Sequence, residues 1–162
     1  VLEHSRRGRS VVRLKAGDPL VFGRGGEEAE ELSLAGVPFE IVPGITSALG
    51  AAAYAGIPLT HRDLASDVAF ASGHDLAGVR GSHTDFAPLA AAGGTLVLYM
   101  ATRTLAANLA RLVTLGRAKD TPAALIVRAT TAGHRVVEGT LDDLAQRAAG
   151  VDEHEPALVV VG

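Results

Sequence analysis

Short apolar runs alternate with segments at helical spacing along the first part of the chain. Residues 11–14 and residues 39–42 are β-branched and apolar, which predicts two buried strands. Each run leads through a loop with Gly and Pro into a predicted helix, at residues 27–35 and residues 46–55, and a glycine after each helix predicts its end. This order is half of an α/β layer, so we expect it to need strands that these residues do not supply.

The second part of the chain predicts a nearly complete α/β or α+β domain. Residues 56–66 interrupt the pattern as a candidate linker, so we expect two domains, residues 1–62 and residues 63–162. A long polar loop is expected at residues 72–85. Apolar runs predict strands at 68–71, 95–99, 123–127 and 157–161, with an extended partner at 135–138. Helical spacing predicts helices at 86–92, at 105–115 and from Thr140 onward, with Thr140 as N-cap and Asp143 at the capping-box position.

Composition excludes several classes of protein. The formal net charge is −3, which argues against non-specific nucleic-acid binding, since that requires a basic surface. There is no Cys, and the six His are scattered without a metal-ligand spacing, so we expect no disulfide and no metal site. No apolar run reaches the roughly 18 residues that span a membrane. Without a visible signal peptide, we expect a cytoplasmic protein. Since the sequence starts at Val1 as if at the end of a helix, we expect a fragment of a longer protein.

Two loops are candidates for ligand binding. Gly17 and Asp18 follow the first predicted strand, and Thr46 and Ser47 follow the second strand and open a helix. In open α/β sheets, ligands bind beyond the carboxyl ends of the strands, so these loops would converge on one crevice. An ordinary turn also explains the first loop, and simple helix capping also explains the second.

The string GRGGEEAE, which begins at Gly23, resembles a phosphate-binding loop but fails its spacing. The pattern G-x-G-x-x-G requires Gly where Glu28 stands, and a P-loop would require Lys followed by Ser or Thr. The string is then either a flexible entry to a helix or a place where Arg24 faces an anion. The sequence contains no G-x-S-x-G string, so it does not predict a serine hydrolase.

Taken together, two longer strings resemble the tetrapyrrole methylase family. They are VVRLKAGDPLVFGRGGEEAEEL and GVPFEIVPGITSALGAAAYAGIPLTHRDLAS. The branch that methylates uroporphyrinogen III is the most similar, because FGRGGEE and PGITSA occur together there. The later strings GGTLVLYMA, PAALIVRATTAGHRVVEGTLDDL and PALVVVG are similar as well, so the resemblance covers essentially the whole chain.

The resemblance implies an α/β fold: the two-domain tetrapyrrole methylase fold, with an incomplete first domain and a ligand cleft between the domains. It implies S-adenosyl-L-methionine as methyl donor, no metal, and a homodimer. The implied activity is C-methylation of uroporphyrinogen III to precorrin-2, in sirohaem and cobalamin biosynthesis. The implied cofactor contacts are Ala16, Gly17, Asp18, Val21, Thr46, Ser47, Met100 and Ala129. The hypothetical partners of the substrate carboxylates are Arg24, His61 and Arg62.

Alternatives stay open beside this interpretation. The chain could belong to a methylase of another corrin-pathway tetrapyrrole, to the methylase half of a bifunctional sirohaem synthase, or to a non-catalytic fragment that binds S-adenosylmethionine. The family's opening strand and its Pro/Gly cofactor loop are absent from these residues. We therefore assign no catalytic acid or base and expect this fragment alone to be inactive.

Three residues depart from the family pattern. Ala16 replaces the first Gly of a pair, which would cost about 1 kcal/mol if that backbone required a positive φ. Asp67 stands where Ser is usual, and Ala101 stands where Gly is usual.

Overall fold

The chain forms two compact units, Val1–Ser47 and Ala48–Gly162. The structure is a computed structural model that describes residues 1–74 and 84–162. Most of the predicted polar loop at residues 72–85 therefore lies outside the described residues. The expected domain boundary after residue 62 stays a prediction. Each unit is described by itself.

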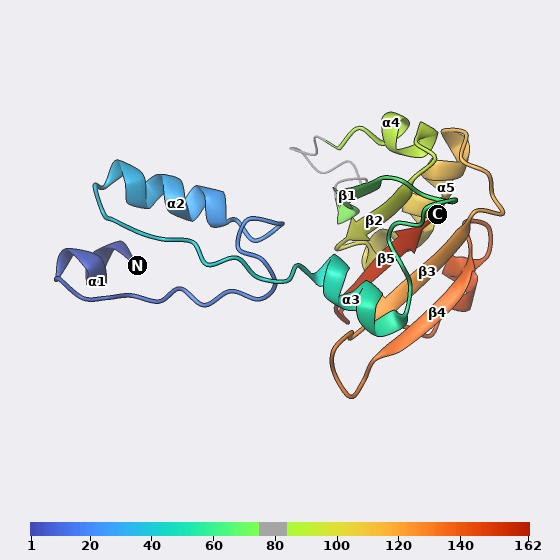
Figure 1. The fold of residues 1–162 in the computed structure, drawn as a ribbon. Coiled ribbons are helices and arrows are strands. Elements are labelled where there is room, and N and C mark those ends of the chain that lie inside the picture. Colours follow the sequence, from blue (N-terminus) through green and yellow to red (C-terminus); the bar gives the residue numbers. More distant parts are fainter. Residues whose placement is uncertain (75–83) are drawn as a thin grey trace. The chain divides into compact units, whose positions relative to one another are not determined.

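The first unit holds two helices, α1 (Leu2–Arg6) and α2 (Gly25–Leu34) (Figure 1). Helix α2 confirms the predicted helix but begins two residues earlier. Glu27 and Glu28 occupy its first turn, where the helix dipole favours negative charge. The helix ends as expected before Gly36, which adopts a left-handed φ of 67°.

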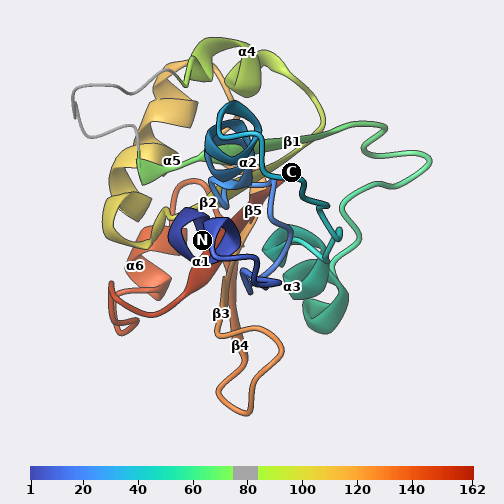
Figure 2. The ribbon, with the colours of Figure 1, turned by 90° about the vertical axis from the view of Figure 1, so that its left-hand side faces the viewer.

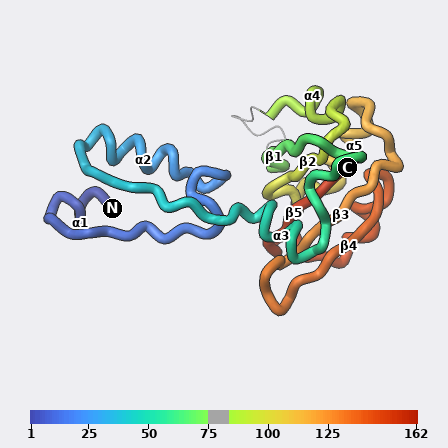
Figure 3. The backbone as a smooth tube through the Cα atoms, viewed as in Figure 1, coloured from blue at the N-terminus to red at the C-terminus, as the bar shows by residue number. Residues whose placement is uncertain are grey.

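The two strands predicted in the first unit are not formed as strands. Residues 11–14 and residues 39–42 are extended, but neither pairs with another segment in the part of the chain that the structure describes. Figure 3 shows both as smooth extended traces that run in the same direction, one before α2 and one after it. The apolar pattern correctly indicates an extended backbone, but a strand also requires a neighbour for its N–H and C=O groups.

The second unit is built on a five-stranded mixed sheet (Figure 1). Its strands are β1 (Val68–Ser72), β2 (Thr95–Tyr99), β3 (Pro122–Val127), β4 (Arg135–Thr140) and β5 (Ala157–Val161), in the order β1-β2-β5-β3-β4. The five predicted strands are confirmed, with small shifts of their ends. Strands β1 and β2 are parallel, and β5 is antiparallel to both β2 and β3. Strands β1, β2 and β3 therefore all end at the same edge of the sheet.

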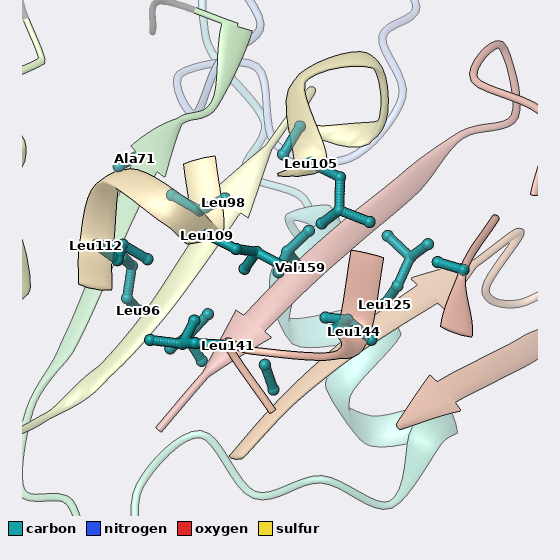
Figure 4. Packing of buried hydrophobic residues seen from close by; sticks show 14 of the residues in the cluster. Ala71, Leu96, Leu98, Leu105, Leu109, Leu112, Leu125, Leu141, Leu144 and Val159 are labelled. Carbon is teal, nitrogen blue, oxygen red and sulfur yellow. The ribbon is translucent and has the colours of Figure 1, made fainter. Parts of the chain in front are cut away.

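Three helices cover one face of this sheet: α4 (Phe86–Ala91), α5 (Leu105–Thr114) and α6 (Leu144–Arg147). Leu105, Leu109 and Leu112 recur along α5 at helical spacing and lie in one buried cluster with residues of the strands, as Figure 4 shows. Val159 of β5 and Leu125 of β3 belong to the same buried cluster and contribute the side of it that lies on the sheet. This is the main hydrophobic core.

Helix α3 (Ser47–Ala55) covers the opposite face (Figure 2). Its buried residues are all alanines, Ala48, Ala51 and Ala52, so the helix can pack closely on the sheet. The Ala48 amide donates a 3.0 Å hydrogen bond to the Tyr99 hydroxyl of β2. The ring of Tyr54 meets His134 edge to face, with ring centroids 6.5 Å apart. Helix α3 therefore forms the second cover of the sheet.

The predicted helix start at Thr140 is wrong. Thr140 is the last residue of β4, paired with Pro122 of β3, and α6 begins only at Leu144 with Asp143 as its N-cap. Asp143 nevertheless reaches back as a capping box would, because its carboxylate accepts the Thr140 amide at 2.7 Å. Sheet pairing outweighs the helix signal at this position.

Among the described residues, no helix is long and apolar enough to cross a bilayer.

Candidate functional site

Asp18 joins the two glycine turns of the first unit. Its carboxylate accepts the Leu20 amide at 2.9 Å and the Gly44 amide at 3.0 Å. The bond from Gly44 is the largest cause that lowers the pKa of Asp18 below its ordinary value, followed by the bond from Leu20. Asp18 is therefore an ionised group held in a fixed orientation.

The turns touch through their backbones as well. A Cβ on Gly44 would lie 2.1 Å from the Gly17 carbonyl oxygen, so only glycine fits there. Gly17 has a left-handed φ of 69°, and a Cβ on it would lie 3.7 Å from both the Ser47 nitrogen and the Thr46 Cα. The first unit thus gathers the predicted cofactor residues Gly17, Asp18, Thr46 and Ser47 in one place.

Ala16 and Val21 flank this turn. Ala16 is not among the residues with positive φ, so the cost expected for replacing Gly does not arise there. Val21 is half-buried two residues before Gly23.

Lys15 and Glu28 stabilise this loop, although neither residue was predicted to have a role. The Lys15 ammonium donates to the Gly23 carbonyl and forms an ion pair with Glu28 at 3.0 Å. Lys15 has only 11% of its side chain exposed, and Arg13 adds a second contact to Glu28 at 3.2 Å. The available signal was that Lys15 is one of only two lysines in an arginine-rich chain.

The GRGG string forms a tight backbone junction rather than a phosphate cradle. The Gly25 amide donates to the Pro19 carbonyl at 2.9 Å, and a Cβ on Gly25 would lie 2.3 Å from the same oxygen. Arg24 between the glycines adopts a left-handed φ of 58° as N-cap of α2. Its exposed guanidinium contacts Glu27 at 2.7 Å. Arg24 is thus exposed at the loop but already has an acidic neighbour.

In the second unit, unusual backbone conformations gather where the strands end. Met100 follows β2 with φ 55°, and Arg128 and Thr130 follow β3 with φ 47° and 66°. Non-glycine residues in this region are strained, and such strain concentrates at functional sites. Met100 and the half-buried Ala129 between Arg128 and Thr130 therefore lie at the same sheet edge, in turns of matching conformation.

A polar cluster fixes the end of β1 beside Met100. The Gly73 amide donates to the Tyr99 carbonyl at 2.7 Å, while its own carbonyl accepts from Thr104 at 2.9 Å and from Asn108 at 3.2 Å. Asn108 is fully buried on α5, and its Oδ1 has no hydrogen-bond partner among the described residues. The signal that could have found it is a polar residue at a core-facing position of an apolar helix.

The two remaining departures from the family pattern sit differently. Ala101 is fully buried against Gly73. A Cβ on Gly73 would lie only 2.5 Å from the Cβ of Ala101, so with alanine at position 101 this contact requires glycine at position 73. Asp67 precedes β1, at the end of the strand opposite Gly73. Asp67 is therefore not part of the edge that carries Met100.

His61 and Arg62 lie on an exposed turn between α3 and β1. The His61 ring accepts the Asp63 amide at 3.2 Å, and the backbone pairs with Ala65. Among the described residues, no hydrogen bond or ion pair joins His61 or Arg62 to Met100 or Ala129. Nor do the described residues contain a group of three side chains suited to a metal ion.

Comparison with known proteins gives consistent matches. The family described as Tetrapyrrole (Corrin/Porphyrin) Methylases matches residues 1–145. A siroheme synthase from Pseudomonas paraeruginosa is 51% identical over 164 residues, and one from Tolumonas auensis is 50% identical over 162. Both matches cover 100% of this chain but only 34% of the relative, so the chain spans about a third of their length.

Solved structures match as well. A uroporphyrin-III C-methyltransferase from Thermus thermophilus, complexed with S-adenyl homocysteine, is 41% identical with a TM-score of 0.83, over 99% of this chain and 69% of that one. A cobalt precorrin-4 methyltransferase is 30% identical with a TM-score of 0.86, over 99% of this chain and 67% of that one.

Proposed function

Since this chain belongs to the tetrapyrrole methylase family, we propose that it forms part of an enzyme that transfers methyl groups from S-adenosyl-L-methionine to uroporphyrinogen III. Two pyrrole carbons of the substrate would each gain a methyl group and lose a proton, which gives precorrin-2. The named relatives support this reaction, since they are siroheme synthases and a uroporphyrin-III C-methyltransferase.

The observation that carries the proposal is the position of Asp18. It is an ionised carboxylate that bridges the Gly17 and Gly44 turns, and each of its oxygens accepts one backbone amide. A carboxylate offers about four acceptor sites, and the Val21 amide also interacts with Asp18, so roughly one or two sites remain for a ligand. Those sites suit the donors of S-adenosylmethionine, which are the ribose hydroxyls and an ammonium group.

The donor set of the chain fits this cofactor in two further respects. A glycine with positive φ at residue 17 leaves backbone groups accessible without a side chain. In the second unit, the strained turns at Met100 and Ala129 present backbone groups at one sheet edge, where α/β folds bind ligands. Met100 also offers an exposed apolar side chain. We therefore propose that these residues hold the cofactor.

The cofactor supplies a methyl group already activated by a positively charged sulfur. What remains for the protein is to position the accepting carbon in line with that methyl group and to exclude water. The described residues would contribute to this positioning by rigidity, since Asp18, Lys15 and Asn108 each bond to a backbone turn. The base that removes the ring proton is not assigned to any residue of this chain.

Calorimetric titration with S-adenosylhomocysteine tests the proposal. We expect Asp18→Asn to raise the dissociation constant by roughly tenfold or more, the usual effect of losing a charged acceptor. Glu30→Gln, an exposed acid on α2 in the same unit, is the matched control and should leave it unchanged. The titration should be run on this chain and on a longer one that covers the full length of a relative. No binding by either, or equal binding by Asp18→Asn, would overturn the proposal.

A methylase of a different corrin-pathway tetrapyrrole is the second candidate. The cobalt precorrin-4 methyltransferase has the higher TM-score, 0.86 against 0.83, but the lower identity, 30% against 41%. Identity reports on side chains that select a substrate, whereas the TM-score reports on the backbone, so uroporphyrinogen III is the better proposal. A homodimer also stays a prediction, which sedimentation equilibrium on the longer polypeptide would test.

A further inference from the structure

Tyr99, the last residue of β2, is anchored at three points. Its hydroxyl accepts the Ala48 amide of α3 at 3.0 Å, although the two residues are 51 positions apart in the sequence. Its backbone carbonyl accepts the Gly73 amide at 2.7 Å. Its ring meets Phe70 of β1 edge to face, with ring centroids 5.9 Å apart, and the residue is buried. One residue therefore ties the start of α3 to the ends of β1 and β2.

Met100, which directly follows Tyr99, is strained and open. Its φ of 55° lies in the left-handed region, and the residue is 53% exposed. Among the described residues, no backbone–backbone hydrogen bond involves the amide or the carbonyl of Met100. The next residue, Ala101, is fully buried, and its carbonyl accepts the Thr104 amide at 3.2 Å. A strained backbone persists only where its surroundings hold it, so Met100 depends on the fixed residues on either side.

The Tyr99 hydroxyl has a second effect, at the start of α3. The first amides of a helix have no acceptor inside the helix, and Ala48 is the second residue of α3. Ala48 is fully buried, so the hydroxyl of Tyr99 takes the place that water would have at an exposed helix end. A buried amide that loses its acceptor is costly. Removing the hydroxyl would therefore loosen the first turn of α3, which opens with Ser47.

We propose that Tyr99 is a positioning residue for the cofactor, which holds the backbone of Met100 and the first turn of α3 in the conformation that S-adenosylmethionine binds. Tyr99 acts through Met100 and Ala48 rather than by its own contact with the cofactor, since its ring is buried and its hydroxyl binds the Ala48 amide. The inference rests on the proposed function, because it concerns the same cofactor.

Coupling between this hydrogen bond and the ligand works in both directions. If the bond from Ala48 to Tyr99 favours binding, the bound ligand must stabilise that bond by the same factor. Saturation with S-adenosylhomocysteine should therefore raise the hydrogen-exchange protection of the Ala48 amide by roughly tenfold in the unaltered protein. The Leu115 amide, bonded to the Arg111 carbonyl at 2.9 Å at the end of α5, is the control and should not change. An unchanged Ala48 amide under saturation would overturn the proposal.

Tyr99→Phe removes the hydroxyl and keeps the ring beside Phe70. We expect it to raise the calorimetric dissociation constant for S-adenosylhomocysteine by roughly tenfold. Thr95→Val takes a hydroxyl from the first residue of the same strand, and Leu112→Val shortens a fully buried side chain of α5, which lowers stability away from Met100. Both controls should bind like the parent. All variants are compared well below their melting temperatures, where a small unfolded fraction leaves the apparent affinity unchanged.

The outcomes separate this inference from the proposed function. If the unaltered protein binds S-adenosylhomocysteine but Tyr99→Phe binds equally well, or if Leu112→Val weakens binding as much, only the role of Tyr99 is overturned. If the unaltered protein does not bind, either as this chain or as the longer polypeptide, the proposed function fails and this inference fails with it. Should Tyr99→Phe not fold, the exchange of the Ala48 amide in the unaltered protein decides the question.

Discussion

The carboxylate of Asp18 accepts the backbone amide of Gly44 at 3.0 Å, although the two residues are 26 positions apart in the sequence. This bond brings the loop after the first extended segment onto the loop after the second. It turns two glycine turns, each unremarkable alone, into one rigid corner of the first unit.

Gly44→Ala should open this corner. The added Cβ would lie 2.1 Å from the Gly17 carbonyl oxygen, a contact that backbone atoms cannot relieve by rotating a side chain. We expect a loss of about 1–3 kcal/mol in local stability, as for overpacked sites. Hydrogen exchange of the Gly44 amide would measure it. Gly26→Ala in α2 is the control, because it has open space and should be neutral or slightly stabilising. Equal behaviour of the two variants would contradict the packing argument.

Acid should loosen the same corner. The pKa of Asp18 is lowered by the amides of Gly44 and Leu20, so the folded form holds the carboxylate ionised more strongly than the unfolded chain does. A depressed pKa contributes stability that is present above the unfolded value, near 3.9, and is lost as pH falls through the folded value. The protection factor of the Gly44 amide, which corrects for the intrinsic pH dependence of exchange, should therefore fall below about pH 4 in the parent chain. Asp18→Asn should flatten this pH dependence, and an unchanged profile would remove the role of Asp18.

Arg24→Ala tests substrate recognition. Uroporphyrin III, the oxidised form of the proposed substrate, carries acetate and propionate groups that suit a guanidinium. If Arg24 binds one of these groups, the dissociation constant of the Arg24→Ala variant for uroporphyrin III should rise by roughly tenfold. The dissociation constant of the same variant for S-adenosylhomocysteine should change little. Fluorescence titration and calorimetry measure the two constants. Arg111→Ala on the exposed face of α5 is the control. Equal effects on both ligands would exclude a specific role for Arg24 toward the substrate.

The sequence predicts the second unit better than the first for a physical reason. Strands β2 and β5 were predicted residue for residue, because both faces of the sheet are covered within these residues and the apolar runs are buried as the pattern requires. Residues 11–14 and 39–42 carry the same kind of pattern, yet they lack a neighbour to pair with. A periodicity reports what a segment can bury, not whether its partner is present.

Some features of the candidate site could also be predicted from the sequence, and others could not. The glycine turns at Gly17 and Gly44 were predicted to meet, and they do, through the bond from the Gly44 amide to Asp18 and the close approach of Gly44 to the Gly17 carbonyl. The contacts of Lys15 with Glu28 and of Asn108 with Gly73 were not predicted from the sequence. They depend on contacts between residues distant in the sequence, which no local pattern encodes. The roles given to Met100, Ala129, His61 and Arg62 stay predictions.

Gly73→Ala should destabilise the second unit as a whole. The added Cβ would lie 2.5 Å from the Cβ of Ala101 and 2.6 Å from Nδ2 of Asn108, in a fully buried position where neither neighbour can retreat. We expect a loss of about 1–3 kcal/mol in the free energy of unfolding, measured by urea denaturation. Gly93→Ala has nothing within 4 Å of its new Cβ and serves as the control. The double variant Gly73→Ala with Ala101→Gly should recover part of the loss, since it restores the space that Ala101 occupies. Failure of this rescue would show that the Ala101 contact is not the cause, and Asn108 would then be the residue that requires glycine at position 73.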